Sequence, residues 1–183
     1  RGIFIAKLDN GHDLPWGRLE QAAFIALIWI EIYNYYSMNK KSFTYNLFDF
    51  DKSLLTRDQG VNGVLRVTND LFRIYLLDFK IDRLELAIDS DKESIGSVVE
   101  KFKYDLDALY LFVKKLANYL CYFEWRYGEI EKMSEEQLNI QRSYKGAGGY
   151  NLITKNLVRH LTGCDDQHIS TLAKKLLTNL ENA

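Results

Sequence analysis

Residues that interrupt helices are scarce in this chain, and that scarcity limits the folds it can adopt. Pro15 is its one proline among 183 residues. Apolar side chains return every three or four positions over long stretches, for example from Val61 to Leu77, which is typical of helices that bury one face. A many-stranded β architecture needs frequent turns between short strands. We therefore predict an all-α fold of six to eight helices.

Capping residues indicate where these helices begin. The expected caps are Asp13 with Pro15 in the first turn, Asp91 or Ser94, Ser134 in a capping box with Gln137, and Asp165 or Asp166. The expected helices are 14–36, 61–77, 82–87, 94–127 with a break near 104, 135–144, 151–161 and 166–180. Residues 2–6 predict a short extended segment near the N-terminus, while 42–51 fit an extended piece or a loop.

The first predicted helix differs from the others in its apolar pattern. Between Ala22 and Tyr33 its apolar residues surround the whole circumference, which predicts a buried central helix. The apolar run 22–32 contains Glu31 and falls short of the roughly 20 residues that cross a membrane. We therefore expect no membrane contact.

Composition bounds the class of protein. An apolar fraction of 47% suits one helical domain over residues 1–183. Cys121 and Cys164 are too few for a disulfide framework, so we expect a cytoplasmic protein. The chain begins with Arg1, and we expect it to be a fragment of a longer protein. A net charge of −1 argues against coating nucleic acid, so any such contact must come from a local patch.

One such patch is visible between residues 137 and 164. This stretch contains no Asp or Glu but holds Arg142, Lys145, Lys155, Arg159 and His160. At its centre the residues KGAGGYN (145–151) lead into an apolar helical pattern. Glycines let backbone N–H groups turn toward a ligand, and a helix N-terminus adds positive potential. The pattern predicts an anion site, with phosphate as the expected anion.

Two interpretations of the glycine segment stay open, since a structural turn would also explain Gly146 or Gly149. A Walker loop would place Lys and Ser/Thr after the last glycine, where this chain has Tyr150 and Asn151. If the segment binds an anion, the candidate residues are Arg142, Lys145, Gly146, Gly148, Gly149, Tyr150, Asn151, Lys155 and Arg159. Secondary candidates, at and after a second glycine segment (57–63), are Arg57, Arg66 and Arg73.

Catalytic patterns are weak. Cys164 with His160 and His168 supplies fewer ligands than structural zinc uses, so we expect no metal and no cofactor. Arg159 and His160 are adjacent, which does not fit the spacing of a HEPN-type helical nuclease. We therefore favour a non-catalytic protein over a nuclease.

Tyrosines and other aromatic residues cluster on two predicted helices, at 33–36 and 119–127. Rings at helical spacing are typical of a core or of an interface with a partner. Tyr144 and Tyr150 differ from these because they flank the basic glycine segment. A ring beside phosphate-binding cations suits a single-stranded nucleic acid or a nucleotide.

Three segments resemble parts of the C-terminal half of DGQHR-motif proteins, a family that includes dnd-type regulators associated with DNA phosphorothioation. They are 13–18 (DLPWGR), 53–72 (SLLTRDQGVNGVLRVTNDLF) and 143–157 (SYKGAGGYNLITKNL). Their order agrees, but the Asp-Gly-Gln-His-Arg string and the ParB-like core of the family are absent. The resemblance implies a DNA-contacting or regulatory module in DNA modification or phage defence, and it carries over no catalytic residue.

Together these patterns predict a non-catalytic module that binds the phosphate backbone of nucleic acid, with DNA as the expected form. The alternative is a protein-interaction domain that forms homo-oligomers through its tyrosine-rich faces. A helical nuclease is the third hypothesis.

Overall fold

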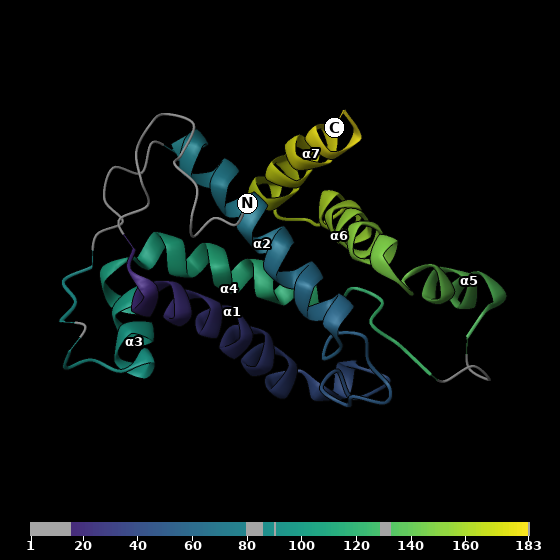
Figure 1. The fold of residues 1–183 in the computed structure, drawn as a ribbon, viewed down its shortest axis with the longest axis horizontal. Coiled ribbons are helices and arrows are strands. Elements are labelled where there is room, and N and C mark those ends of the chain that lie inside the picture. The colour runs from purple at the N-terminus through teal and green to yellow at the C-terminus, as the bar shows by residue number, and fades with distance from the viewer. Residues whose placement is uncertain (1–15, 80–85, 90, 129–132, 183) are drawn as a thin grey trace.

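The structure is a computed structural model, and it describes residues 16–79, 86–89, 91–128 and 133–182. Within these ranges the chain is all-α and has no strand, as the sequence predicts. Figure 1 shows the helices, which are α1 (Arg18–Met38), the 3₁₀ helix η1 (Lys40–Ser42), α2 (Asp58–Phe79), α3 (Ile95–Asp105), α4 (Asp107–Cys121), α5 (Glu135–Ser143), α6 (Ala147–Thr162) and α7 (Gln167–Glu181).

The helices form two groups joined by α2. Helix α1 packs against α3 and α4, while α2 packs against α6 and α7, which also contact each other. Figure 1 shows α2 running between the two groups, with α5 at the far end of the molecule beside α6. Gly63 of α2 permits the α2–α6 contact, because a Cβ atom there would lie 2.9 Å from Leu157 and 3.2 Å from Ile153.

Aromatic rings pack the segment before α1, α1 itself and α3 against α2. Trp16 contacts Phe24, Phe72 and Phe102 with ring centroids 5.0–5.5 Å apart. The start of α1 at Arg18, with Gly17 as N-cap, corrects the predicted start after Asp13. Trp16 enters the core immediately before the helix, so the described helix begins after it. Residues 2–6, Asp13 and Pro15 lie outside the described residues.

Helix α1 is buried along one side. Leu27 and Ile32 are fully enclosed there, whereas Tyr33 and Met38 on the same helix are exposed. The buried side faces α3 and α4, with which α1 packs. Buried residues from Trp16 to Leu176 form one continuous core.

The predicted long helix 94–127 is two helices followed by an irregular segment. Ser94 caps α3 through a capping box, and Leu106 breaks the helix with φ −126° and ψ 53°. Helix α4 ends at Cys121 because the next residues pair with another part of the chain: Leu54 N–H donates to the Trp125 carbonyl, and Tyr127 N–H to the Lys52 carbonyl. Trp125 is fully buried there.

Other local predictions have mixed outcomes. Ser134 and Gln137 form the expected capping box of α5, and Asp166 caps α7 by accepting N–H bonds from His168 and Ile169. Residues 42–51 form turns and one end of η1, and 86–89 are not helical, although 82–87 was predicted to be. Residues 82–85 lie outside the described ranges.

None of the described helices is long and apolar enough to cross a membrane.

Candidate phosphate and ligand site at helices α5 and α6

The glycine segment forms the junction between α5 and α6. Gly146 is the N-cap of α6 and has φ +82°, a left-handed conformation that side chains disfavour. Gly148 and Gly149 belong to the first turn of α6, so the helix begins before the predicted residue 151. The structural-turn interpretation therefore accounts for Gly146 without any ligand.

Gly149 cannot bind phosphate as predicted. Its N–H donates to the Gly146 carbonyl at 3.1 Å, and the residue is buried. A Cβ atom at this position would lie 1.9 Å from the Tyr144 carbonyl oxygen, so glycine is needed for a close backbone contact. Gly146 and Gly148 are exposed. Within the described part of the chain their N–H groups have no hydrogen-bond partner, as is usual for the first turn of a helix.

The predicted cations fall into two groups. Arg142 and Lys145 are exposed, and neither forms an ion pair with a carboxylate that the structure describes. Lys155 Nζ and Arg159 Nη2 instead lie 3.7 Å and 3.5 Å from Glu181 Oε1 of α7. The sequence has no carboxylate between residues 137 and 164. In the folded protein, however, Glu181 of α7 lies beside Lys155 and Arg159.

Most of the remaining candidate residues lie elsewhere or already contact other side chains. Arg66 Nη1 donates to Asn151 Oδ1 at 2.7 Å, beside a small cavity of about 250 Å³. Tyr150 is half-buried. Arg57 lies between the rings of Phe50 and Tyr127, 4.6 Å and 3.9 Å from their centroids, and donates to the Phe50 carbonyl. Arg73 lies about two turns beyond Arg66 on α2.

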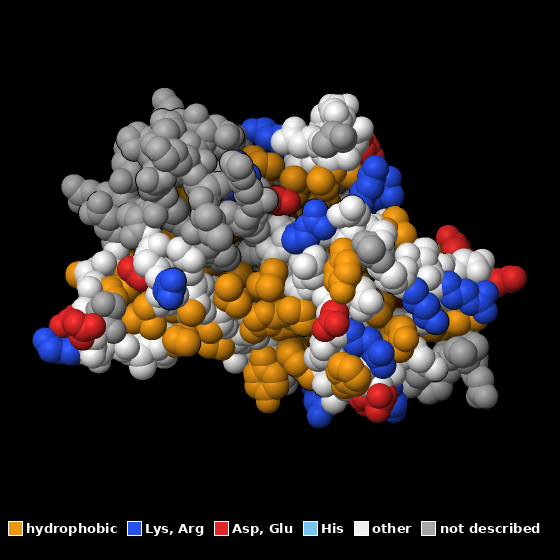
Figure 2. Space-filling view, in the orientation of Figure 1, with side chains coloured by type: hydrophobic (Ala, Val, Ile, Leu, Met, Phe, Trp, Pro, Cys, Tyr) orange, Lys and Arg blue, Asp and Glu red, His pale blue; other side chains and the backbone are white. Residues whose placement is uncertain are grey.

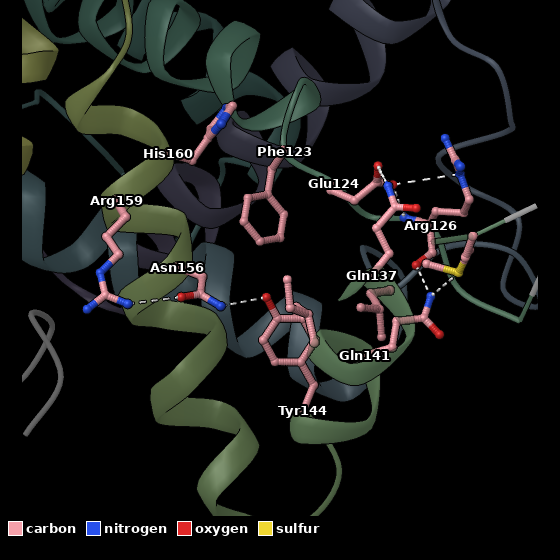
Figure 3. Close-up of a pocket in the computed structure, with 12 residues that line it drawn as sticks. Phe123, Glu124, Arg126, Gln137, Gln141, Tyr144, Asn156, Arg159 and His160 are labelled. Atoms are coloured by element: carbon pink, nitrogen blue, oxygen red, sulfur yellow. Dashed lines mark hydrogen bonds and ion pairs between the residues drawn. The ribbon is translucent and has the colours of Figure 1, made fainter. Parts of the chain in front are cut away.

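A larger pocket, which the sequence did not reveal, lies between α5 and α6. Its volume is about 460 Å³. One wall is the face of α5 that carries residues 137, 140, 141 and 144, and the opposite wall is the face of α6 that carries 156, 159 and 160. Figure 3 shows Phe123 between these walls. The i, i+3, i+4, i+7 spacing on α5 is the sequence signal of this face, although it does not predict a cavity.

Hydrogen bonds fix most polar side chains of the pocket. Asn156 Nδ2 donates to Tyr144 Oη at 2.9 Å, and Gln137 Nε2 donates to Glu124 Oε2 at 3.3 Å. Gln141 Nε2 donates to the backbone carbonyl of Arg126. Burial raises the pKa of the Tyr144 phenol, and the bond from Asn156 only partly offsets this. The phenol therefore stays protonated at neutral pH and can donate to a ligand.

The histidines and cysteines are held in separate contacts. His160 Nε2 lies 3.0 Å from the Tyr119 carbonyl, whereas the His168 ring packs 5.4 Å from Tyr75. Burial raises the pKa of the Cys121 thiol to about 12, which keeps it protonated and unreactive. The described residues contain no cluster of three His, Cys, Asp or Glu side chains that could hold a metal ion.

Comparison of the chain with protein-family models, with curated proteins and with solved structures finds no match. The similarity of three segments to DGQHR-motif proteins therefore stays a prediction from the sequence.

Proposed function

We propose that this protein binds the phosphate backbone of nucleic acid, without catalysis, through a basic surface formed by Arg142, Lys145 and the first turn of α6. The observation that carries the proposal is the coincidence of two kinds of donor. Arg142 and Lys145 are exposed and unmatched by a described carboxylate, and the exposed Gly146 and Gly148 beside them carry N–H groups without a partner in the described chain. Both attract phosphate.

The wider charge distribution supports the same location. Lys155 and Arg159 share one carboxylate, Glu181, so this group of three retains one net positive charge. Figure 2 shows lysine and arginine side chains over α5 at one end of the molecule, with acidic side chains beside them; Glu135 and Glu136 lie in the first turn of α5. Contacts of this kind hold a nucleic-acid strand in place without reading its sequence.

The biological setting of the proposal comes from the resemblance to DGQHR-motif proteins. That resemblance supports a regulatory role in DNA modification or phage defence, with DNA as the partner and the cytoplasm as the location. A phosphate-bearing small ligand would satisfy the same donors.

The proposal predicts a measurable dependence on salt. In fluorescence anisotropy with a labelled single-stranded oligonucleotide, the Arg142→Ala/Lys145→Ala variant should bind more weakly than the wild type. Losing two phosphate contacts should reduce the slope of log K against log salt by about 1.4. A duplex of the same length tests whether double-stranded DNA binds as well.

The matched control is Lys92→Ala/Lys103→Ala, which removes the same charge near and on α3, at the opposite end of the molecule (Figure 1). It should leave the slope nearly unchanged, because its side chains pair with Asp89 and Glu100 instead. Equal slopes for the wild type and the α5–α6 variant would rule the basic surface out.

A second candidate function, homo-oligomerisation, is favoured by an aromatic surface made of Tyr33, Tyr35, Phe43, Phe48 and Tyr122. The two tyrosine clusters predicted from the sequence meet here: the hydroxyl oxygens of Tyr35 and Tyr122 lie 2.9 Å apart, and Tyr122 stacks on Phe43 at 5.4 Å. Tyr33 and Tyr122 are 56% and 50% exposed. Figure 2 shows further hydrophobic side chains exposed over α1 and α4.

Light scattering tests this candidate. If the aromatic surface is an interface, the mass of the wild type rises with concentration, and Tyr33→Ser/Tyr122→Ser remains a monomer because the interface loses its largest exposed rings. Tyr104→Ser, on α3 and also exposed, is the control and should assemble as the wild type does. A monomeric mass for the wild type at every concentration would exclude the interface.

A further inference from the structure

We infer that the pocket between α5 and α6 binds one unstacked nucleobase of the strand whose phosphates lie on the basic surface. This inference rests on the proposed function and specifies its ligand as a single strand. It uses the cavity and its side chains, which the backbone-binding proposal does not require.

The size and floor of the pocket suit a planar ring. Its volume of about 460 Å³ falls within the range of pockets that enclose small organic ligands. Phe123 and Tyr144 line it, and Leu54, Ile140 and Met133 add apolar surface. Figure 3 shows the rings of Phe123 and Tyr144 among the side chains that line the pocket. Aromatic side chains of this kind are the usual stacking surfaces for bases.

Amides and a phenol make up much of the polar lining, which also includes His160 and the Glu124 carboxylate. Gln137, Gln141 and Asn156 carry amides, and the Tyr144 hydroxyl accepts a bond from Asn156, which leaves its hydrogen free to donate. Bases offer neutral donors and acceptors along their edges, and amide side chains pair with such edges. The inner surface therefore matches a base better than it matches a phosphate.

The two arginines of the pocket are turned toward its rim. Arg126 lies over the Tyr45 ring at 5.4 Å and has its Nε 3.8 Å from Glu124. Arg159 contacts Asn156 and Glu181 on the outer side of α6. Figure 3 shows both guanidinium groups pointing away from Phe123. Two guanidinium groups, each near one carboxylate, thus lie at the opening, where the phosphates flanking a bound base would lie.

The chain also links the pocket to the basic surface. At the end of α5, Gln141 and the C-cap residue Tyr144 line the pocket, and their sequence neighbours Arg142 and Lys145 are exposed. A strand on the basic surface therefore passes beside the pocket opening. In a duplex the base would first have to leave its pair and its stack, which costs binding free energy, so the pocket favours single strands.

The test compares two single-stranded oligonucleotides with equal numbers of phosphates, one with thymine bases and one with abasic residues at every position. Anisotropy titrations at the same low salt should show about 5- to 150-fold weaker binding of the abasic strand to the wild type, the effect of losing one stacked base. This comparison needs no variant, so it does not depend on how a substitution affects folding.

Two substitutions locate the effect. Ile140→Trp fills the pocket from α5, and Ile95→Trp makes the same change on α3; the two isoleucines are 41% and 46% exposed. Ile140→Trp should bind both strands equally, with the affinity that the wild type has for the abasic strand. Ile95→Trp should retain the wild-type preference.

Different results would contradict the base site and the proposed backbone binding. Equal, salt-dependent affinity of the wild type for both strands would overturn the base site and leave backbone binding intact. A preference for thymine that survives in Ile140→Trp would also overturn the base site, because the base would then bind elsewhere. No binding of either strand at low salt would overturn the proposed function and the base site with it.

Discussion

Replacing Trp125 with alanine is expected to lower the free energy of unfolding by about 3–5 kcal/mol, the usual cost of removing a large buried ring. Trp125 is 0% exposed and contacts the Phe123 ring at 4.7 Å. Its indole Nε1 donates to the Leu120 carbonyl at 2.7 Å, and its backbone N–H donates to Tyr45 Oη at 2.9 Å. The substitution therefore leaves a cavity and removes the indole hydrogen bond to the Leu120 carbonyl, which keeps only its backbone partners such as the Phe123 N–H at 3.3 Å.

Urea unfolding followed by far-ultraviolet circular dichroism measures this loss. Trp125→Phe is the matched control, since it keeps an aromatic ring and removes the indole hydrogen bond. It should be destabilised less than Trp125→Ala, because the phenyl ring leaves a smaller cavity than the alanine methyl group does. A loss below about 0.5 kcal/mol for Trp125→Ala would mean that this side chain is not enclosed as described, because surface substitutions typically stay within that range.

The second large effect is expected from Gly149→Ala. The new Cβ atom would lie 1.9 Å from the Tyr144 carbonyl oxygen, so the junction of α5 and α6 must shift. Overpacking of this kind typically destabilises a protein by about 1–3 kcal/mol, and by more where backbone atoms clash. The contact involves two backbone segments, which cannot relax by a change of rotamer.

Gly148→Ala is the control one residue away in the same helical turn. No atom lies within 4 Å of its added Cβ, and alanine restricts the unfolded chain, so this variant should gain about 0.4–1 kcal/mol. Thermal unfolding of the two variants should therefore shift the midpoint in opposite directions. Similar shifts for both would show that the glycines at 148 and 149 are equivalent and that no close contact exists.

Predictions that depend on a few neighbouring residues succeeded. The predicted capping box of Ser134 with Gln137 depends on side chains three residues apart. Ser94 and Asp166, each one of two predicted caps, accept N–H bonds from residues two or three positions later. Such local signals can be read from a sequence, because helix geometry fixes the bonding partners. The all-α class follows from the same short-range periodicity.

Predictions that depend on distant contacts were less accurate. The start of α1 was misplaced because Trp16 packs on Phe72, which lies 56 residues away in the chain. The end of α4 was misplaced because Trp125 is tied to Leu54. Sequence alone also could not place Glu181 beside two of the predicted cations, since the packing of α7 on α6 brings it there.

The order of the helices along the chain prevents division of this protein into two autonomous halves. Helix α2 precedes α3 and α4 in sequence, yet its main contacts are with α6 and α7, which come last. Any one cut between α1 and α7 therefore separates a helix from a partner on which it packs. A truncated form that keeps only one group of helices should expose apolar surface and aggregate.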